Sequence, residues 1–224
     1  MIINENFRLL QGFEPHFEKI IYPIYKQHED TFDIDKIHGV LHIARSIIAS
    51  YILSCKCNEI GLHNNLEDIL IATAFHDSGR QNGGTDYWEG ISSSNCEKFI
   101  NQMEFNWGEK ITNNSASLVA SYIIKSNQQD STNFKCIHDS DCLEVMRPCT
   151  GRDGINGFIP SYMKLYSNEQ MKPFLDSLVY EWWNFVYETE SNKIELSTPN
   201  CLERLIDLLI LKKEYYPIIN SFLC

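Results

Sequence analysis

Two histidines and an arginine stand close together in the segment IHGVLHIARS, residues 37–46. His38 and His42 are four residues apart and Arg45 follows three residues later, so a helix would place all three side chains on one side. In isolation, such residues more often flank the apolar stripe of a half-exposed helix than form a site. The segment becomes informative only together with two others.

A second segment, DILIATAFHDSGR (68–80), runs from an apolar stretch directly into the doublet His76-Asp77. A helix that is apolar on nearly every side is buried, so its polar end is expected inside the protein. A buried histidine beside a buried carboxylate is costly unless a partner interacts with both, and a metal ion does so. Ordinary helix termination is the alternative. The dipeptide alone is a weak signal, because it occurs a second time at His138-Asp139.

A third segment, CIHDSDCLEVMRP (136–148), combines apolar positions that can pack inward with the carboxylates of Asp139 and Asp141. Imidazole nitrogen together with carboxylate oxygen suits Mn²⁺, Fe²⁺, Co²⁺, Ni²⁺ or Zn²⁺ better than Ca²⁺. Each of the three segments delivers such groups at a polar interruption of an apolar pattern. Together they predict a site for a divalent transition metal.

Helical periodicity dominates the elements that would position these segments, and no alternating strand pattern, repeat or linker occurs. Pro15 and Pro23 would break or kink the first helix, Asn64 or Asn65 would cap the third, and Gly79 would close it. The spacing predicts an all-α protein with helices over 5–28, 36–54, 64–77, 89–103, 114–126, 134–146, 168–190 and 199–212, and a glycine-rich loop at 147–161. We expect a single domain over 1–224, with its motif-bearing core at about 36–147 and a C-terminal helical extension at about 160–224.

Composition and charge limit the partners. A chain of 224 residues with 43% hydrophobic residues can bury a globular core. The net charge of −11 argues against a nucleic-acid groove. No stretch is expected to be long and apolar enough to cross a bilayer, and the N-terminus MIINENFRLL lacks the pattern of a secretory signal. We expect a cytoplasmic location, with signal-independent export as the alternative.

The eight cysteines form no paired C-x-x-C motif, so a zinc ribbon is not expected. Reduced thiols in a cytoplasm-like compartment are the favoured interpretation. Cys136 and Cys142 flank His138, but at helical spacing this arrangement indicates core packing before it indicates a nucleophile.

Three motifs follow one another along the chain: His42 at the start of HIARSIIAS, the doublet His76-Asp77, and Asp141 at the start of DCLE. In this order they resemble the motifs of the HD-domain superfamily of metal-dependent phosphohydrolases. The resemblance covers roughly residues 36–147 and implies an HD-type helical bundle with extra C-terminal helices. It implies that His42, His76, Asp77 and Asp141 hold a metal ion, with Asp141 preferred to Asp139 because of the DCLE pattern. The implied activity is hydrolysis of a phosphate ester, with a nucleotide or another small phosphomonoester as the expected substrate.

The resemblance also bears on the number of metal ions. Two-metal members of the superfamily draw further histidines from the helices between the doublet and the final aspartate. This chain has no histidine between His76 and His138, which favours one divalent ion.

Two short strings, HDSGR and HG..H..R, are also similar to the phosphodiesterase domains of SidE-type bacterial effectors, which act on phosphoribosylated protein. Those domains do not use the full metal set, which this sequence retains. The similarity gives an alternative function, a phosphodiesterase for a phosphoribosyl- or ADP-ribose-type linkage. A non-catalytic binding module of the same fold is a further alternative, and the retained set of buried ligands argues against it.

Other residues near the motifs are candidates for binding the substrate or for proton transfer. Asp77 would be both ligand and catalytic residue, and His38 would contact the substrate, help to activate water or support a ligand. Many one-metal nucleotidases of the superfamily carry a glutamate three residues after the doublet, where this chain has Arg80. Glu89 is our first choice, before Asp86, for the missing acid or base, and a solvated carboxylate without a catalytic role is the favoured alternative.

The phosphate itself would need positive charge, because it must be attracted against the overall negative field. Arg45, Arg80 and Arg147 are the candidates for binding it. Salt bridges at the surface are the alternative for each.

Overall fold

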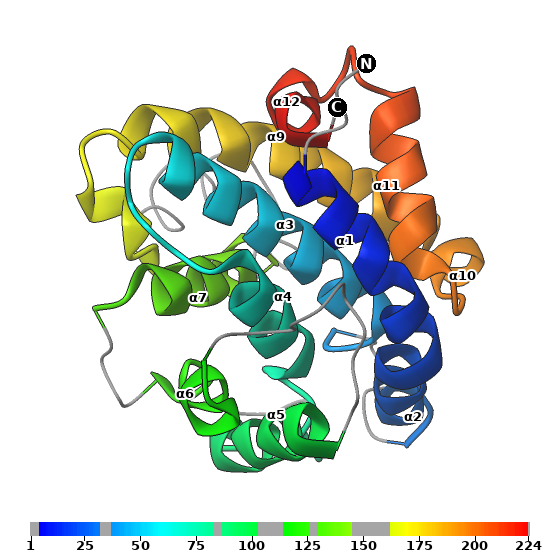
Figure 1. Ribbon diagram of the computed structural model, residues 1–224. Coiled ribbons are helices and arrows are strands. Elements are labelled where there is room, and N and C mark those ends of the chain that lie inside the picture. Colours follow the sequence, from blue (N-terminus) through cyan, green and yellow to red (C-terminus); the bar gives the residue numbers. More distant parts are fainter. Residues whose placement is uncertain are drawn as a thin grey trace.

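The computed structural model describes residues 5–31, 37–82, 87–102, 114–125, 130–144 and 162–223, and every regular element within these ranges is helical (Figure 1). The expectation of an all-α protein is therefore confirmed, and the predicted loop 147–161 lies outside the described residues. The elements are α1 (Glu5–His16), the π-helical turn η1 (Phe17–Ile21), α2 (Tyr22–Thr31), α3 (Val40–Glu59), α4 (Leu66–Phe75), α5 (Glu89–Gln102), α6 (Ala116–Ser121), α7 (Thr132–Glu144), the 3-10 turn η3 (Leu165–Ser167), α9 (Lys172–Ser191), α10 (Lys193–Leu196), α11 (Cys201–Leu211) and α12 (Pro217–Leu223).

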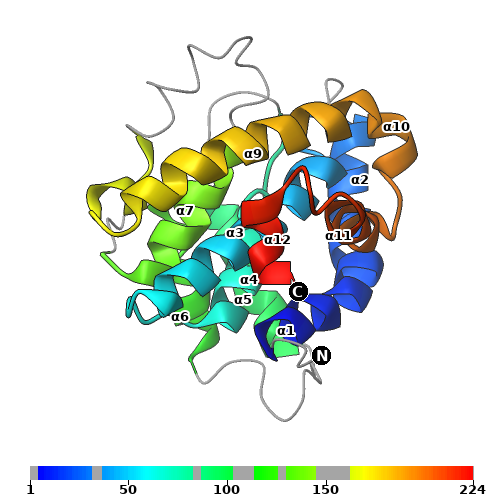
Figure 2. The same ribbon diagram turned by 90° about the horizontal axis from the view of Figure 1, so that it is seen from above.

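The helix α3 lies at the centre of the molecule, with α4, α7 and α11 packed against it (Figure 2). Nearly all its side chains are buried. By length and composition this helix could cross a membrane, which corrects the expectation that no stretch qualifies. Because 94% of its most apolar window is buried inside the protein, α3 has the position of a core helix.

The helix α4 presents the His76-Asp77 doublet because it ends just before it. The Asn65 side chain caps its start by accepting a hydrogen bond from the Asp68 N–H at 2.9 Å, as predicted for one of two candidate asparagines. The helix ends at Phe75, and residues 76–79 form a turn. The doublet therefore sits on a turn at the buried end of an apolar helix.

Gly79 fixes the exit of this turn by close packing and not by a left-handed backbone, which among the described glycines occurs at Gly61 alone. A Cβ atom at position 79 would lie 2.7 Å from the Ser92 backbone nitrogen and 2.7 Å from Ile91 Cβ. The Gly79 N–H also donates to Ser92 Oγ at 2.9 Å. The expected helix-closing glycine thus serves a different purpose, which is to seat the turn directly on α5.

The N-terminal helices brace α3 and α4. Pro15 and Pro23 lie on either side of η1, so the regular helix is interrupted where the prolines predicted it. Pro23 has no N–H to donate to the preceding turn, and the wider π-helical turn accommodates this loss. The buried Tyr25 hydroxyl donates to the Ala74 carbonyl at 3.0 Å. The helix α2 thereby holds the end of α4 that carries the doublet.

The C-terminal helices continue the same hydrophobic core, with α9 against α7 and both α11 and α12 against α3. Trp182 is fully buried, whereas Trp183 is half-buried and stacks on Tyr187 with 5.8 Å between ring centroids. The last helix, α12, is joined to α3 by a hydrogen bond that the Tyr51 hydroxyl donates to the Phe222 carbonyl at 2.7 Å.

Candidate active site

Four side-chain atoms from α3, from the turn after α4 and from α7 converge on one buried point. His42 Nε2 lies 3.2 Å from His76 Nε2, 3.4 Å from Asp77 Oδ2 and 3.7 Å from Asp141 Oδ1. His76 Nε2 lies 3.7 Å from Asp77 Oδ2 and 3.6 Å from Asp141 Oδ1. The structure thus brings together the four residues implied as metal ligands, and we call them the imidazole–carboxylate cluster.

Contacts on the far side of each ring turn Nε2 toward this cluster. His76 Nδ1 lies 2.7 Å from the Thr73 carbonyl oxygen, which only accepts hydrogen bonds, so Nδ1 carries a proton. His42 Nδ1 faces the buried Glu144 carboxylate at 3.7 Å. Both rings therefore direct Nε2 to the shared point.

Asp141 faces the cluster and Asp139 does not. The two oxygens of Asp139 accept the backbone N–H groups of Lys164 and Leu165, each at 2.8 Å. These bonds hold the start of η3 against α7 and use the carboxylate for structure. The aspartate of the DCLE pattern is accordingly the one placed beside the histidines.

Mutual attraction within the cluster shifts the pKa values of its members. Burial alone would lower the pKa of His76, but the carboxylates of Asp77 and Asp141 outweigh burial and raise this pKa to about 9. Burial alone would raise the pKa of both aspartates, but the neighbouring histidines hold each pKa below its ordinary value. The two carboxylates are thus ionised, and the point between the four residues favours a positive charge.

A divalent metal ion fits this donor set. All four atoms are ones that bind transition metals, and a tetrahedral zinc site with bonds of about 2.1 Å separates its ligand atoms by about 3.4 Å. The separations between the histidine nitrogens and their neighbours in the cluster run from 3.2 to 3.7 Å. Three members of the cluster, His42, His76 and Asp141, lie close enough together for a cation, and so do His38, His42 and Asp77.

His38 lies at the edge of the cluster and is half-buried. Its Nδ1 is 2.9 Å from Asp77 Oδ2. Burial lowers the pKa of His38, and the opposing effect of Asp77 is smaller, so the ring is neutral at pH 7.

Gly39, the residue after His38, leaves room for the Glu29 side chain. A Cβ at Gly39 would lie 2.2 Å from Glu29 Oε1, and this oxygen accepts the Val40 N–H at 2.9 Å. This contact sets where α3 begins.

The three arginines expected to bind phosphate have different surroundings. Arg80 Nε lies 2.9 Å from Asp77 Oδ1, and the side chain is buried, so the arginine holds Asp77 in place from the side away from His38. Arg147 lies outside the described residues. Arg45 requires a correction.

Arg45 is fully buried and does not reach the pocket surface. Its guanidinium donates to Glu144 at 2.9 Å, to Thr189 Oγ1 at 2.9 Å and to Glu190 Oε1 at 2.7 Å. The expectation that it contacts substrate is therefore replaced by a role in joining α3 to α7 and α9. Helical spacing placed Arg45 near the histidines but could not show that α9 covers it.

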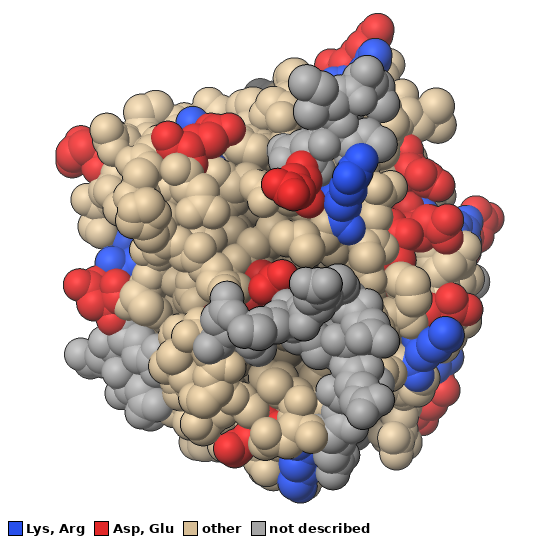
Figure 3. Space-filling model, viewed as in Figure 1, with Lys and Arg blue, Asp and Glu red and all other residues tan. Residues whose placement is uncertain are grey.

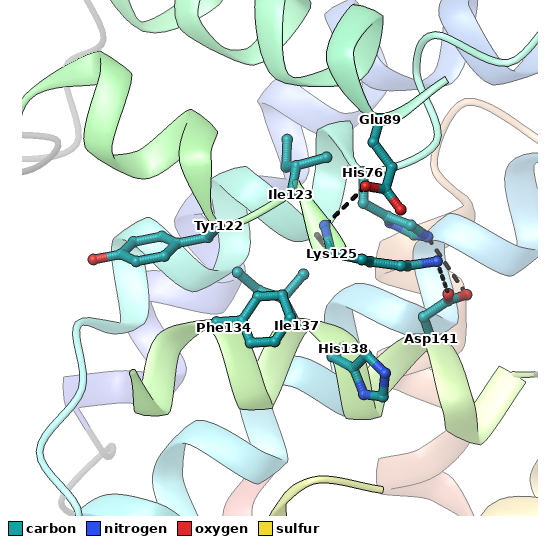
Figure 4. A pocket seen from close by; sticks show the side chains of 9 residues that line it. All are labelled: His76, Glu89, Tyr122, Ile123, Lys125, Phe134, Ile137, His138 and Asp141. Atoms are coloured by element: carbon teal, nitrogen blue, oxygen red, sulfur yellow. Dashed lines mark hydrogen bonds and ion pairs between the residues drawn. The ribbon is translucent and has the colours of Figure 1, made fainter. Parts of the chain in front are cut away.

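A pocket opens on one side of the cluster (Figure 4). Its lining consists of His76, Glu89, Tyr122, Ile123, Lys125, Phe134, Ile137, His138 and Asp141. Lys125 Nζ lies 3.5 Å from Asp141 Oδ2, and its backbone N–H donates to Glu89 Oε2 at 2.8 Å. Figure 4 shows the Lys125 and His76 side chains directed toward Asp141. Glu89, chosen as the acid or base, is thus brought to the same pocket.

The sequence reasoning missed Lys125, His138 as a pocket residue, and Glu144. Lys125 belongs to the segment predicted as a helix over 114–126, although α6 ends at Ser121, and it carries no motif that could have found it. Glu144 is the last residue of the DCLE string, which was read for its aspartate alone. His138 belongs to the dipeptide set aside as incidental, and its Nδ1 lies 2.8 Å from Asp139 Oδ1.

Positive charge outside the pocket is sparse on the face shown in Figure 3, where the Lys and Arg side chains of the described residues are separated by acidic and uncharged ones. This pattern agrees with the net charge of −11.

The pocket thus brings together imidazole, carboxylate and ammonium groups, which are the side chains that take part in acid–base chemistry. The chain belongs to the SidE phosphodiesterase (PDE) domain family, whose model matches residues 36–180. The protein is thus assigned to a family of phosphodiesterases. No curated protein and no solved structure matches the chain.

Proposed function

We propose that this protein hydrolyses a phosphodiester of the phosphoribosyl or ADP-ribose type. The observation that carries the proposal is the family match, because residues 36–180 include every residue that lines the pocket. The same observation favours a diester over the small phosphomonoester first expected from the resemblance to HD-domain phosphohydrolases. That wider resemblance remains a prediction from sequence.

Binding of the phosphate is proposed to rest on Lys125 and His138. Both side chains line the pocket. The Glu89 carboxylate accepts the backbone N–H of Lys125, and the Lys125 ammonium group lies 3.5 Å from the carboxylate of Asp141. A simple phosphodiester carries one negative charge and the diphosphate of an ADP-ribose carries two, and an ammonium group can offset one of them in a pocket that also contains the carboxylates of Glu89 and Asp141.

Proton transfer is proposed for His138, in addition to its contact with the phosphate, and for Glu89. His138 Nδ1 lies 2.8 Å from Asp139 Oδ1, so this carboxylate can accept the Nδ1 proton, and when Nε2 is protonated as well the ring can give that second proton to the leaving oxygen. Glu89 uses Oε2 to accept the Lys125 N–H, and its carboxylate can take a proton from the attacking water. Both assignments follow from position in the pocket.

The imidazole–carboxylate cluster is proposed to hold one divalent transition metal through His42, His76, Asp77 and Asp141. Such an ion, when bound, lowers the pKa of a bound water and polarises a phosphoryl oxygen. His38 and Arg80 keep Asp77 in place through its two oxygens. The four donor atoms, the two orienting contacts on the histidines and the low pKa values of the aspartates support this assignment.

The proposal is tested by offering the purified protein bis(p-nitrophenyl) phosphate, p-nitrophenyl phosphate and a protein that carries ADP-ribose, each with Mn²⁺ or Zn²⁺. Phosphorus NMR identifies the products. We expect release of phosphomonoesters from the diesters and little free phosphate from the monoester. Preference for the monoester would contradict the proposal and restore the small-phosphomonoester alternative.

A further inference from the structure

A chain of buried polar contacts runs from α9 to His42. Glu144 is fully buried at the end of α7. Its Oε1 accepts the indole N–H of Trp182 at 3.1 Å, and its Oε2 accepts the Nε–H of Arg45 at 2.9 Å. The same Oε2 lies 3.7 Å from His42 Nδ1. The carboxylate thus stands between α9 and a histidine of the imidazole–carboxylate cluster.

The other end of this chain of contacts is anchored to α9. Arg45 donates to Thr189 Oγ1 at 2.9 Å and to Glu190 Oε1 at 2.7 Å. Thr189 is fully buried, as are Trp182 and Arg45. The orientation of the Glu144 carboxylate is therefore fixed by donors whose own positions are set by α9.

A fixed negative charge near one ring nitrogen of a histidine favours the proton on that nitrogen. With the proton on Nδ1 of His42, the lone pair of Nε2 points at the cluster, where the other three donor atoms meet. Without a group that holds the ring and its Nδ1 proton, a histidine spends part of its time protonated on Nε2, which then has no lone pair to offer to the cluster. Carboxylate groups behind metal-binding histidines commonly exert this control.

We propose that Glu144 and Trp182 are positioning residues for His42, with Trp182 acting through Glu144. The expected effect on catalysis rests on the proposed function, whereas the expected orientation of the His42 ring does not. Trp182, Thr189 and Glu190 lie beyond residue 180, where the family match ends. The functional unit therefore extends through α9 and is larger than the matched segment.

The test uses the full chain and compares Trp182→Phe with Trp183→Phe. The first change removes the N–H that Glu144 accepts, and the second makes the same change on the neighbouring, half-buried tryptophan. Nitrogen-15 NMR of the imidazoles, recorded without metal or substrate, reports which nitrogen of His42 carries the proton. We expect Nδ1–H in the wild type and in Trp183→Phe, and a mixture of both forms in Trp182→Phe. An unchanged His42 spectrum in Trp182→Phe would overturn the proposal.

Kinetics supply a second readout with a double-variant cycle. We expect Glu144→Gln to lower kcat by about 10- to 100-fold with little change in KM, as for other groups behind catalytic histidines. Trp182→Phe should add no further loss in the Glu144→Gln background, because its effect passes through that carboxylate. Independent, additive losses would overturn the proposed order of action.

The outcomes separate this inference from the proposed function. If the wild type hydrolyses no diester, the proposed function fails, and the NMR comparison alone decides whether Glu144 and Trp182 position His42. If Glu144→Gln does not fold, the Trp182→Phe spectrum still supports or overturns the inference.

Discussion

His42 Nε2 and His76 Nε2 face each other at 3.2 Å, although each of these nitrogens carries a lone pair when its ring is neutral and protonated on the far side. The oxygens of Asp77 and Asp141 lie within 3.7 Å of both. Four groups that all attract positive charge cannot share one buried point without a cation between them. A metal ion or a proton on His76 meets that need, and the two can be told apart.

Metal removal is the first prediction. We expect the purified protein to bind about one divalent ion per chain, chelation to abolish diester hydrolysis, and Mn²⁺ or Zn²⁺ to restore it. Elemental analysis and activity assays measure both effects. His76→Ala should lose metal and activity together while circular dichroism shows an intact fold. Full activity in the stripped protein would rule out a catalytic ion and point to a metal-free mechanism.

The stability of the metal-free protein should depend on pH through His76. The pKa of this histidine rises from an ordinary 6.5 to about 9 in the folded protein. Its protonation therefore stabilises the fold fully below pH 6.5, and this contribution is lost as the pH rises through about 9. We expect the free energy of unfolding of the wild type to fall across that window more steeply than that of His76→Gln. Denaturant titrations at several pH values measure the difference, and parallel curves would contradict it.

Lys125 should matter for catalysis more than any other lysine on the same side of the molecule. Lys125→Met removes the ammonium next to Asp141, and we expect kcat/KM to fall by about 10- to 100-fold, as for the loss of a charged transition-state contact. Lys135→Met is the matched control, because Lys135 pairs with the exposed Asp130 instead. Lys125→Arg should recover part of the activity. Equal activities of the two Met variants would remove Lys125 from the site.

Glu89 is predicted to act as a proton acceptor. Glu89→Gln retains an oxygen that can accept the Lys125 N–H, so the local structure should persist while proton transfer is lost. We expect the pH–rate profile to lose one limb in this variant. Glu97→Gln, an exposed change on the same helix, should leave the profile unaltered. A normal profile for Glu89→Gln would restrict the residue to holding Lys125.

The packing of Gly79 against α5 predicts a large effect of one methyl group. Gly79→Ala places Cβ 2.7 Å from backbone and side-chain atoms of α5, and we expect a loss of about 1–3 kcal/mol in stability together with lower activity. Gly90→Ala is the control on α5, since nothing lies within 4 Å of its added Cβ. There the better helix former should be neutral or stabilising by up to about 1 kcal/mol. Equal melting temperatures would show that the turn can move away from α5.

Local patterns in the sequence sufficed for the all-α class, for the interruption at Pro15 and Pro23, and for the cap at one of two asparagines. Helical spacing, ring geometry and capping depend on residues within a few positions of one another, so a single sequence contains them. The boundaries were less well predicted. The helix expected over 114–126 is described only as Ala116–Ser121, and the one expected from 168 begins at Lys172.

The sequence by itself also predicted that His76 and Asp77 lie in the interior, because an apolar helix that ends in polar groups carries them there, whereas the choice of His42 and Asp141 came from the resemblance to HD-domain proteins. Tertiary structure alone decided the rest. It covered Arg45 with α9, placed Glu144 behind His42, and brought Lys125 and His138 to the pocket. These contacts join residues far apart in the chain, and they depend on how the helices pack and rotate against one another, which no local spacing specifies.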